Sequence, residues 1–120
     1  MPLGERPWLV TGASGLLGGE IIRQAAGRAP LVGAYFRHQP APHDGVEYIP
    51  LDVGDQAAVQ RLVRSLHPAV IIHTAYCKEG PDLHRVTALG AGHVAQAASA
   101  VGARLVHISS DVLLDGEHPP

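Results

Sequence analysis

A glycine-rich segment near the start of the chain has residue types and spacing suited to holding phosphate groups. Gly12, Gly15 and Gly18 recur at every third position in the run Thr-Gly-Ala-Ser-Gly-Leu-Leu-Gly, directly after an apolar stretch. In such loops the first glycine permits a tight turn, the second lets a pyrophosphate approach the backbone, and the third lets a helix pack closely on a strand. The start of that helix offers free N–H groups and a partial positive charge. The segment therefore predicts a dinucleotide site, with a purely structural turn as the alternative.

The residues after the next apolar run bear on which dinucleotide would bind. A site for NAD(H) usually presents an acidic side chain about 20 residues beyond the glycines, where it holds the ribose 2′-hydroxyl. The corresponding window, 32–38, contains no acid and ends in Arg37 and His38. Because a guanidinium group pairs well with a 2′-phosphate, the sequence favours NADP(H), with NAD(H) possible. The alternative is that both side chains are solvated residues at the mouth of a loop.

Short apolar runs alternate with segments of helical periodicity along the chain. Strands are predicted at residues 8–10, 31–36, 46–51, 69–72 and 104–108. Helices are predicted at 15–28, between Asp55 and Pro68, and at about 82–101, from the spacing of their apolar residues and their end signals. In the first of these helices, Leu16 and Leu17 fall at the turns with the other periodic residues. Asp55 is the predicted N-cap of the second helix.

This alternation predicts the fold class. The first, fourth and fifth strands are apolar throughout, which is typical of a parallel sheet covered by helices on both faces. Right-handed crossovers then favour an α/β doubly wound arrangement, the Rossmann fold, with five strands in the order 3-2-1-4-5. The chain is expected to form one domain over residues 1–120, and ligands in such sheets bind beyond the carboxyl ends of the strands.

Composition excludes several classes of function. The chain has 120 residues and a formal net charge of −2, so it has no basic field for nucleic acid or an anionic membrane. No apolar run approaches the ~20 residues that a membrane helix needs, and we expect a cytoplasmic protein without a secretory signal. The single cysteine and the scattered spacing of the eight histidines predict no metal site.

Several motifs together resemble those of extended short-chain dehydrogenases. The glycine segment matches their Thr-Gly-x-x-Gly-x-x-Gly loop, and Leu51-Asp52-Val53 resembles their adenine-contacting end of the third strand. The segment 73–76, His-Thr-Ala-Tyr, resembles the Asn-Ala-Ala segment that lines the cofactor after strand four, with His73 replacing an asparagine. The segment 106–116 is similar to the Ser-Thr-Asp-Tyr-Val-Phe-Asp-Gly stretch of the dTDP-4-dehydrorhamnose reductase family, whose members bind sugar nucleotides.

This resemblance implies hydride transfer from NAD(P)H to the C4 ketone of a nucleotide-linked sugar. By position, Asp52 and Val53 would lie at the adenine, and Ser110 would take the hydroxyl role beside the reacting carbonyl, with Asp111 contacting the sugar. A plain turn is the alternative for these last two residues. The cofactor site expected from the spacing and the resemblance together comprises Gly12, Ser14, Gly15, Leu16, Leu17, Gly18, Arg37, His38, Asp52, Val53, Thr74, Ala75 and Tyr76.

The family's Tyr-x-x-x-Lys pair, which supplies the proton donor, has no counterpart in the 120 residues. The resemblance covers the first half or less of a family member, so we expect the substrate lobe to be absent and the chain alone to be inactive. The alternative is a non-catalytic NADP-binding or regulatory module that resembles the regulatory subunit of methionine adenosyltransferase. An uncovered fifth strand also predicts self-association.

Overall fold

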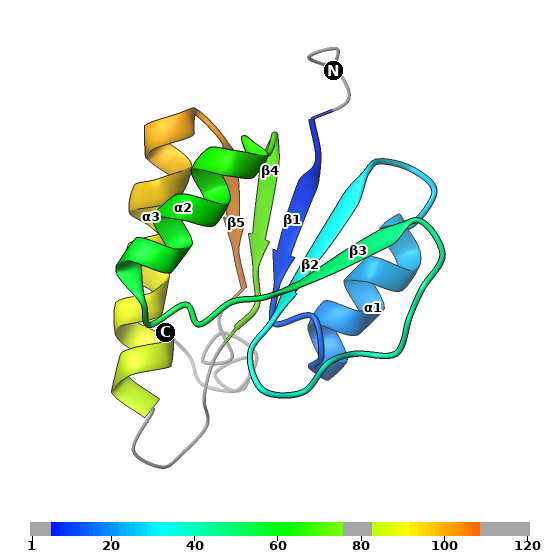
Figure 1. The fold of residues 1–120 in the computed structure, drawn as a ribbon, viewed down its shortest axis with the longest axis horizontal. Coiled ribbons are helices and arrows are strands. Elements are labelled where there is room, and N and C mark those ends of the chain that lie inside the picture. Colours follow the sequence, from blue (N-terminus) through cyan, green and yellow to red (C-terminus); the bar gives the residue numbers. More distant parts are fainter. Residues whose placement is uncertain (1–5, 76–82, 109–120) are drawn as a thin grey trace, which may run out of the picture.

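The computed structural model describes residues 6–75 and 83–108. Its centre is a parallel five-stranded sheet in the order β3-β2-β1-β4-β5. The strands are β1 (Trp8–Thr11), β2 (Leu31–Tyr35), β3 (Val46–Pro50), β4 (Val70–His73) and β5 (Arg104–His107). The helical segments are α1 (Leu16–Ala25), α2 (Gln56–Leu66), η2 (Leu83–Leu89) and α3 (Gly90–Val101). This order confirms the predicted doubly wound α/β fold (Figure 1).

Helices cover both faces of this sheet. Successive side chains of a strand point to opposite faces, so Leu9 and Val10 of β1 enter different apolar clusters. Leu9 packs with residues of α2 and α3, whereas Val10 packs with Ile22 of α1. Helix α1 therefore lies on one face of the sheet, and α2 and α3 lie together on the other (Figure 1).

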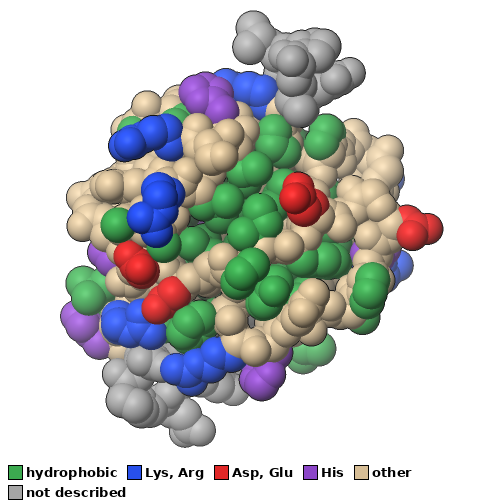
Figure 2. Space-filling view, in the orientation of Figure 1, with side chains coloured by type: hydrophobic (Ala, Val, Ile, Leu, Met, Phe, Trp, Pro, Cys, Tyr) green, Lys and Arg blue, Asp and Glu red, His purple; other side chains and the backbone are tan. Residues whose placement is uncertain are grey.

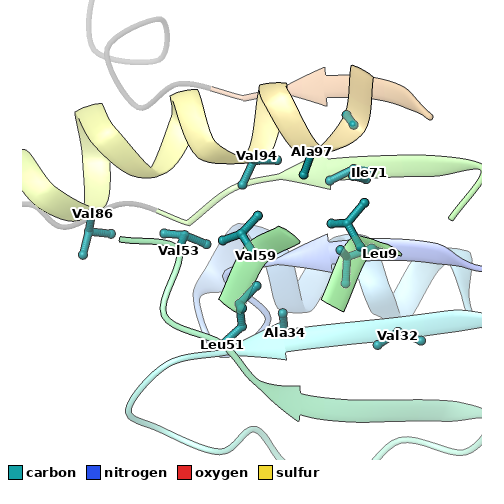
Figure 3. Close-up of a cluster of buried hydrophobic side chains, with 12 residues drawn as sticks. Leu9, Val32, Ala34, Leu51, Val53, Val59, Ile71, Val86, Val94 and Ala97 are labelled. Atoms are coloured by element: carbon teal, nitrogen blue, oxygen red, sulfur yellow. The ribbon is translucent and has the colours of Figure 1, made fainter. Parts of the chain in front are cut away.

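The larger cluster fills the space between the sheet and the pair α2 and α3, as Figure 3 shows. Its buried members are Leu9, Val32, Ala34, Leu51, Val53, Val59, Val63, Ile71, Val86, Val94, Ala97 and Ala98. In α2, Val59 and Val63 are buried and Leu62 and Leu66 pack against the cluster, which confirms the predicted apolar face of this helix. The core thus fixes α2 and α3 against this face of the sheet.

The ends of α2 follow local signals in the sequence. The Asp55 side chain accepts a hydrogen bond from the Ala58 N–H at 3.2 Å, which confirms the predicted N-cap. At the other end, His67 adopts the left-handed conformation, with a φ of 50°. Pro68 follows directly, has no N–H to continue the helix, and leads the chain into β4.

Two helices differ from the prediction, whereas the strand ends move by one residue at most. Helix α1 ends at Ala25, because Ala26 is extended and Gly27 has a φ of 86°. The predicted helix at 82–101 is instead a π-helical segment, η2, followed by α3. At that junction Gly90 lies against Val53, where an added Cβ would be 2.7 Å from Val53 Cγ2. This close contact holds the start of α3 against the segment that follows β3.

The surface in Figure 2 shows hydrophobic side chains gathered over the middle of one face, with most charged side chains nearer the rim. Ile49, Leu62, Leu66 and Leu105 are only partly buried and pack against the larger cluster. Across the described ranges, no helix is long and apolar enough to span a membrane. The self-association expected from the sequence remains a prediction.

Candidate functional site

A pocket of about 500 Å³ lies along the carboxyl edge of the sheet. The ends of all five strands contribute to it, as does the glycine segment before α1. Its lining residues are Thr11, Gly12, Ser14, Gly15, Leu16, Leu17, Gly18, Ala34, Phe36, Arg37, His38, Leu51, Asp52, Val53, Thr74, Ala75, Val86 and Ile108. The position agrees with the general rule that ligands of open α/β sheets bind beyond the carboxyl ends of the strands.

The glycine segment is packed so tightly that side chains are excluded from two of its positions. Gly12 has a φ of 71°, and a Cβ there would lie 2.5 Å from Thr74 Oγ1 and 2.9 Å from the Ala75 nitrogen. A Cβ on Gly18 would overlap the Gly12 carbonyl oxygen and lie 2.8 Å from its carbon. Gly18 therefore lets α1 approach the turn after β1, which is the packing role predicted for the third glycine.

The start of α1 is open toward the pocket. Gly15 is the N-cap and provides no side-chain hydrogen bond to the first turn, and that turn contains no acidic residue. The first N–H groups of a helix lack partners within the helix and carry partial positive charge. Leu16 and Leu17 line the pocket, and Leu16 is 97% exposed, so these two do not share the buried face of Ile22. Their exposure toward the pocket fits the cofactor-site position predicted for both residues.

A buried hydrogen-bond network joins β1 to the end of β4. The Thr11 hydroxyl oxygen accepts the N–H of Thr74 at 3.0 Å and of Ala75 at 3.2 Å. With both lone pairs engaged, the hydroxyl donates its hydrogen to His73 Nδ1, 2.7 Å away. In return, the Thr74 hydroxyl donates to the Thr11 carbonyl oxygen at 2.6 Å. These bonds set the backbone of the pocket wall at Thr74 and Ala75.

His73 is neutral in this network. Because Nδ1 accepts a hydrogen bond, the ring proton resides on Nε2, which is buried and has no partner among the described residues. Burial in the first place, and the nearby His107 ring in the second, 5.1 Å away between centroids, lower the pKa of His73 from 6.5 to about 4. The histidine that replaces an asparagine of the resembled family is thus a positioning group behind the pocket wall, since it acts through Thr11.

The other end of the pocket carries charged and aromatic side chains. Phe36, directly after β2, is 41% exposed and lies beneath the Arg37 guanidinium, whose Cζ is 4.8 Å from the ring centroid. Asp52, two residues after β3, accepts two hydrogen bonds from Arg85 Nη1, at 2.7 Å to Oδ1 and 2.6 Å to Oδ2. The Gly54 N–H donates to the same Oδ1 at 2.9 Å. This end of the pocket therefore carries the basic side chain of Arg37 and one carboxylate, that of Asp52, which Arg85 and the Gly54 N–H hold in place.

Most of the predicted site residues come together in this pocket. Gly12, Ser14, Gly15, Leu16, Leu17, Gly18, Arg37, His38, Asp52, Val53, Thr74 and Ala75 all line it. Tyr76, Ser110 and Asp111 lie outside the described residues. Sequence reasoning missed Ala34, Val86 and Ile108, which have only the apolar character of core residues as a signal, and Arg85, which gave no signal. Within 6–75 and 83–108, no three His, Cys, Asp or Glu side chains are grouped to hold a metal ion.

Comparison with known proteins shows to which family the chain belongs. The sequence profile described as the RmlD substrate binding domain matches residues 6–120. The chain belongs to this family. Among the relatives of this RmlD-family chain, the methionine adenosyltransferase 2 subunit beta of Rattus norvegicus is 34% identical over 124 residues, which cover 97% of the chain. The dTDP-4-dehydrorhamnose reductase of Streptomyces griseus is 35% identical over 122 residues, or 96% of the chain.

The RmlD-family chain matches only part of each of these proteins. It spans 36% of the length of both the Rattus norvegicus and the Streptomyces griseus relative. Among solved structures, the Bordetella bronchiseptica enzyme WbmG in complex with NAD has a TM-score of 0.75 and 26% identity. That likeness covers 88% of this chain and 38% of WbmG. The family and the fold are therefore shared, over about a third of the length of the relatives.

Proposed function

We propose that this chain forms the cofactor-binding part of an NAD(P)H-dependent reductase that acts on the C4 ketone of a nucleotide-linked sugar. The observation that carries the proposal is the pocket at the carboxyl edge of the sheet, where the glycine segment, the start of α1 and Arg37 surround one space. Two likenesses support it: one relative is a dTDP-4-dehydrorhamnose reductase, and WbmG was solved with NAD. The reaction and the substrate rest on likeness to proteins of which the chain spans 36–38%.

The residues of the pocket fit a dinucleotide. Gly12 and Gly18 let the turn after β1 and α1 pack closely beside the pocket, and Gly15 leaves the start of α1 open to a phosphate. The N–H groups there would hold the pyrophosphate, Asp52 and Val53 would lie at the adenine, and the 2′-phosphate of NADP(H) would pair with Arg37. When bound, the nicotinamide supplies the hydride.

The nicotinamide side of the proposed site would be formed after β4. Thr74 and Ala75 line the pocket there, and their backbone N–H groups are both held by the Thr11 hydroxyl, so this wall is rigid. Apolar side chains such as Val86 and Ile108 line neighbouring parts of the pocket, where they would shield a bound cofactor from water. Ser110 and Asp111 remain the proposed substrate contacts, in the roles that the family resemblance gives them.

Changing Gly15 to alanine tests the pyrophosphate position. The new Cβ would be 3.4 Å from the Gly12 carbonyl oxygen, an ordinary contact, so the free energy of unfolding should change by less than about 0.5 kcal/mol. The same methyl group would occupy the approach to the start of α1, so we expect at least about tenfold weaker binding of NADPH. Calorimetric titration with NADPH and urea unfolding measure the two effects.

Gly92→Ala is the matched control, because Gly92 lies in α3 with open space around it. This variant should bind NADPH and NADH as the unmodified chain does. If folded Gly15→Ala protein binds NADPH with unchanged affinity, the pyrophosphate lies elsewhere. If the unmodified folded chain binds neither NADPH nor NADH, the proposed function is wrong.

Arg37→Gln tests the preference for NADP(H). A charge-assisted bond to a phosphate contributes about 1.5–3 kcal/mol, so we expect NADPH to bind roughly 10- to 100-fold more weakly and NADH to bind about equally well. His38→Gln, at the next position of the pocket lining, serves as the comparison and should have a smaller effect. Equal weakening of both dinucleotides by Arg37→Gln would show that Arg37 does not recognise the 2′-phosphate.

A second function is favoured by the relatives themselves. Methionine adenosyltransferase 2 subunit beta matches 97% of this chain at 34% identity, so we also propose, as the alternative, an NADP-binding regulatory module that associates with a methionine adenosyltransferase catalytic chain. Light scattering of the mixed proteins distinguishes the two functions. A stable complex with that catalytic chain favours the module, whereas NADPH binding without any such complex favours the cofactor-binding part of a reductase.

A further inference from the structure

Arg85 is not among the residues that line the pocket, although it is bound to Asp52, which is. It belongs to η2 and reaches across to the end of β3, where its Nη1 contacts both carboxylate oxygens of Asp52 within 2.7 Å. The Arg85 side chain packs directly against Gly54, where no larger residue would fit: a Cβ at Gly54 would overlap Arg85 Nη1 and lie 2.8 Å from Arg85 Cγ. Arg85 is therefore placed by the backbone shape after β3 as well as by its charge.

Asp52 is the only carboxylate among the described residues that line the pocket. An unpaired carboxylate at this end would repel the doubly charged 2′-phosphate of NADP(H) and would leave the hydroxyl of NAD(H) unaffected. The ion pair with Arg85 cancels that charge. Both side chains are only about one-third exposed, at 34% and 29%, so solvent screens the pair less than it would on an open surface.

Phe36 brings Arg85 close to the predicted phosphate-binding group. The Cζ of Arg85 is 5.8 Å from the centroid of the Phe36 ring, and the Cζ of Arg37 is 4.8 Å from the same centroid. The two guanidinium groups therefore both lie within about 6 Å of one aromatic ring at this end of the pocket.

We propose that Arg85 is a specificity-determining residue that favours the 2′-phosphorylated dinucleotide by neutralising Asp52, and this rests on the proposed cofactor site. The inference concerns the ratio of the two affinities. Arg85→Gln should weaken NADPH about tenfold and leave NADH within a factor of about two, because only the phosphorylated cofactor meets the uncovered carboxylate.

The test is a double-mutant cycle with Arg85→Gln, Asp52→Asn and the double variant, titrated with NADPH and NADH separately. In the double variant no carboxylate is uncovered, so the NADPH-to-NADH affinity ratio should return to within about threefold of that of the unmodified chain. Asp52→Asn alone should raise the ratio, because it removes a negative charge from the end of the pocket where the 2′-phosphate would lie. If Arg85→Gln does not fold, the affinity ratio of the Asp52→Asn variant tests the proposal by itself.

The outcomes separate the inference from the proposed function. If Arg85→Gln weakens NADPH and NADH equally, or if the double variant keeps the altered ratio, Arg85 only supports the structure of the pocket and the inference is wrong. A ratio unchanged or lowered by Asp52→Asn has the same meaning. If the unmodified chain binds neither dinucleotide, the proposed function fails and the inference fails with it.

Discussion

Replacing Gly18 by alanine is expected to lower the free energy of unfolding by about 3 kcal/mol or more, at the upper end of the range for overpacked sites. The added Cβ would overlap the Gly12 carbonyl oxygen and lie 2.8 Å from its carbon and 3.0 Å from Thr74 Oγ1. Two of these three atoms are backbone, and the third is held by its hydrogen bond to the Thr11 carbonyl, so none of them moves at low cost. The helix must instead separate from the turn.

Gly19→Ala provides the matched comparison, since it makes the same chemical change one residue further along α1. Its Cβ would lie 3.6 Å from the Ala13 carbonyl oxygen, an ordinary contact. Alanine is the better helix former by up to about 1 kcal/mol, so this variant should be slightly more stable than the unmodified chain. Urea unfolding of the three proteins measures the difference. Equal stability of the two variants would show that Gly18 is not a packing contact.

The features that sequence reasoning predicted well are those with local causes. The glycine spacing, the apolar runs and the cap at Asp55 each depend on residues within a few positions of one another, and all appear in the structure as expected. Sheet order followed from the same runs, because the handedness of crossovers leaves few arrangements. Twelve predicted cofactor residues then gathered in one pocket because the carboxyl ends of parallel strands meet at one edge.

The features that sequence reasoning missed are set by distant partners. Thr11 and His73 pair across β1 and β4, 62 residues apart, and Asp52 and Arg85 pair over 33 residues. Neither pair has a sequence motif, since each depends on strand register or on the path of η2. Leu16, by contrast, was predicted from the local glycine segment to lie at the cofactor site, and it is exposed in the pocket lining. Contacts within a few positions were therefore predictable, whereas contacts between distant elements were not.

The buried His73 is expected to make the fold sensitive to acid in a defined range of pH. Its pKa is about 4 in the folded chain, against 6.5 for an ordinary histidine. Between these values the unfolded chain binds a proton that the folded chain does not, so the stability contributed by neutral His73 is complete above pH 6.5 and decreases as the pH falls to about 4. The full loss corresponds to roughly 3 kcal/mol.

His73→Asn isolates this contribution, because asparagine offers Thr11 a carbonyl acceptor but does not titrate near neutral pH. We expect the unmodified chain to lose roughly 3 kcal/mol more stability than this variant between pH 6.5 and pH 4, measured by urea unfolding at each pH. Parallel curves for the two proteins would mean that His73 titrates normally. The nitrogen chemical shifts of the His73 ring give an independent reading, because the Thr11 hydrogen bond requires the neutral form with its proton on Nε2. A site wall held by that bond should then lose its order at Thr74 and Ala75 only as the pH falls through about 4, where His73 takes up a proton in the folded chain.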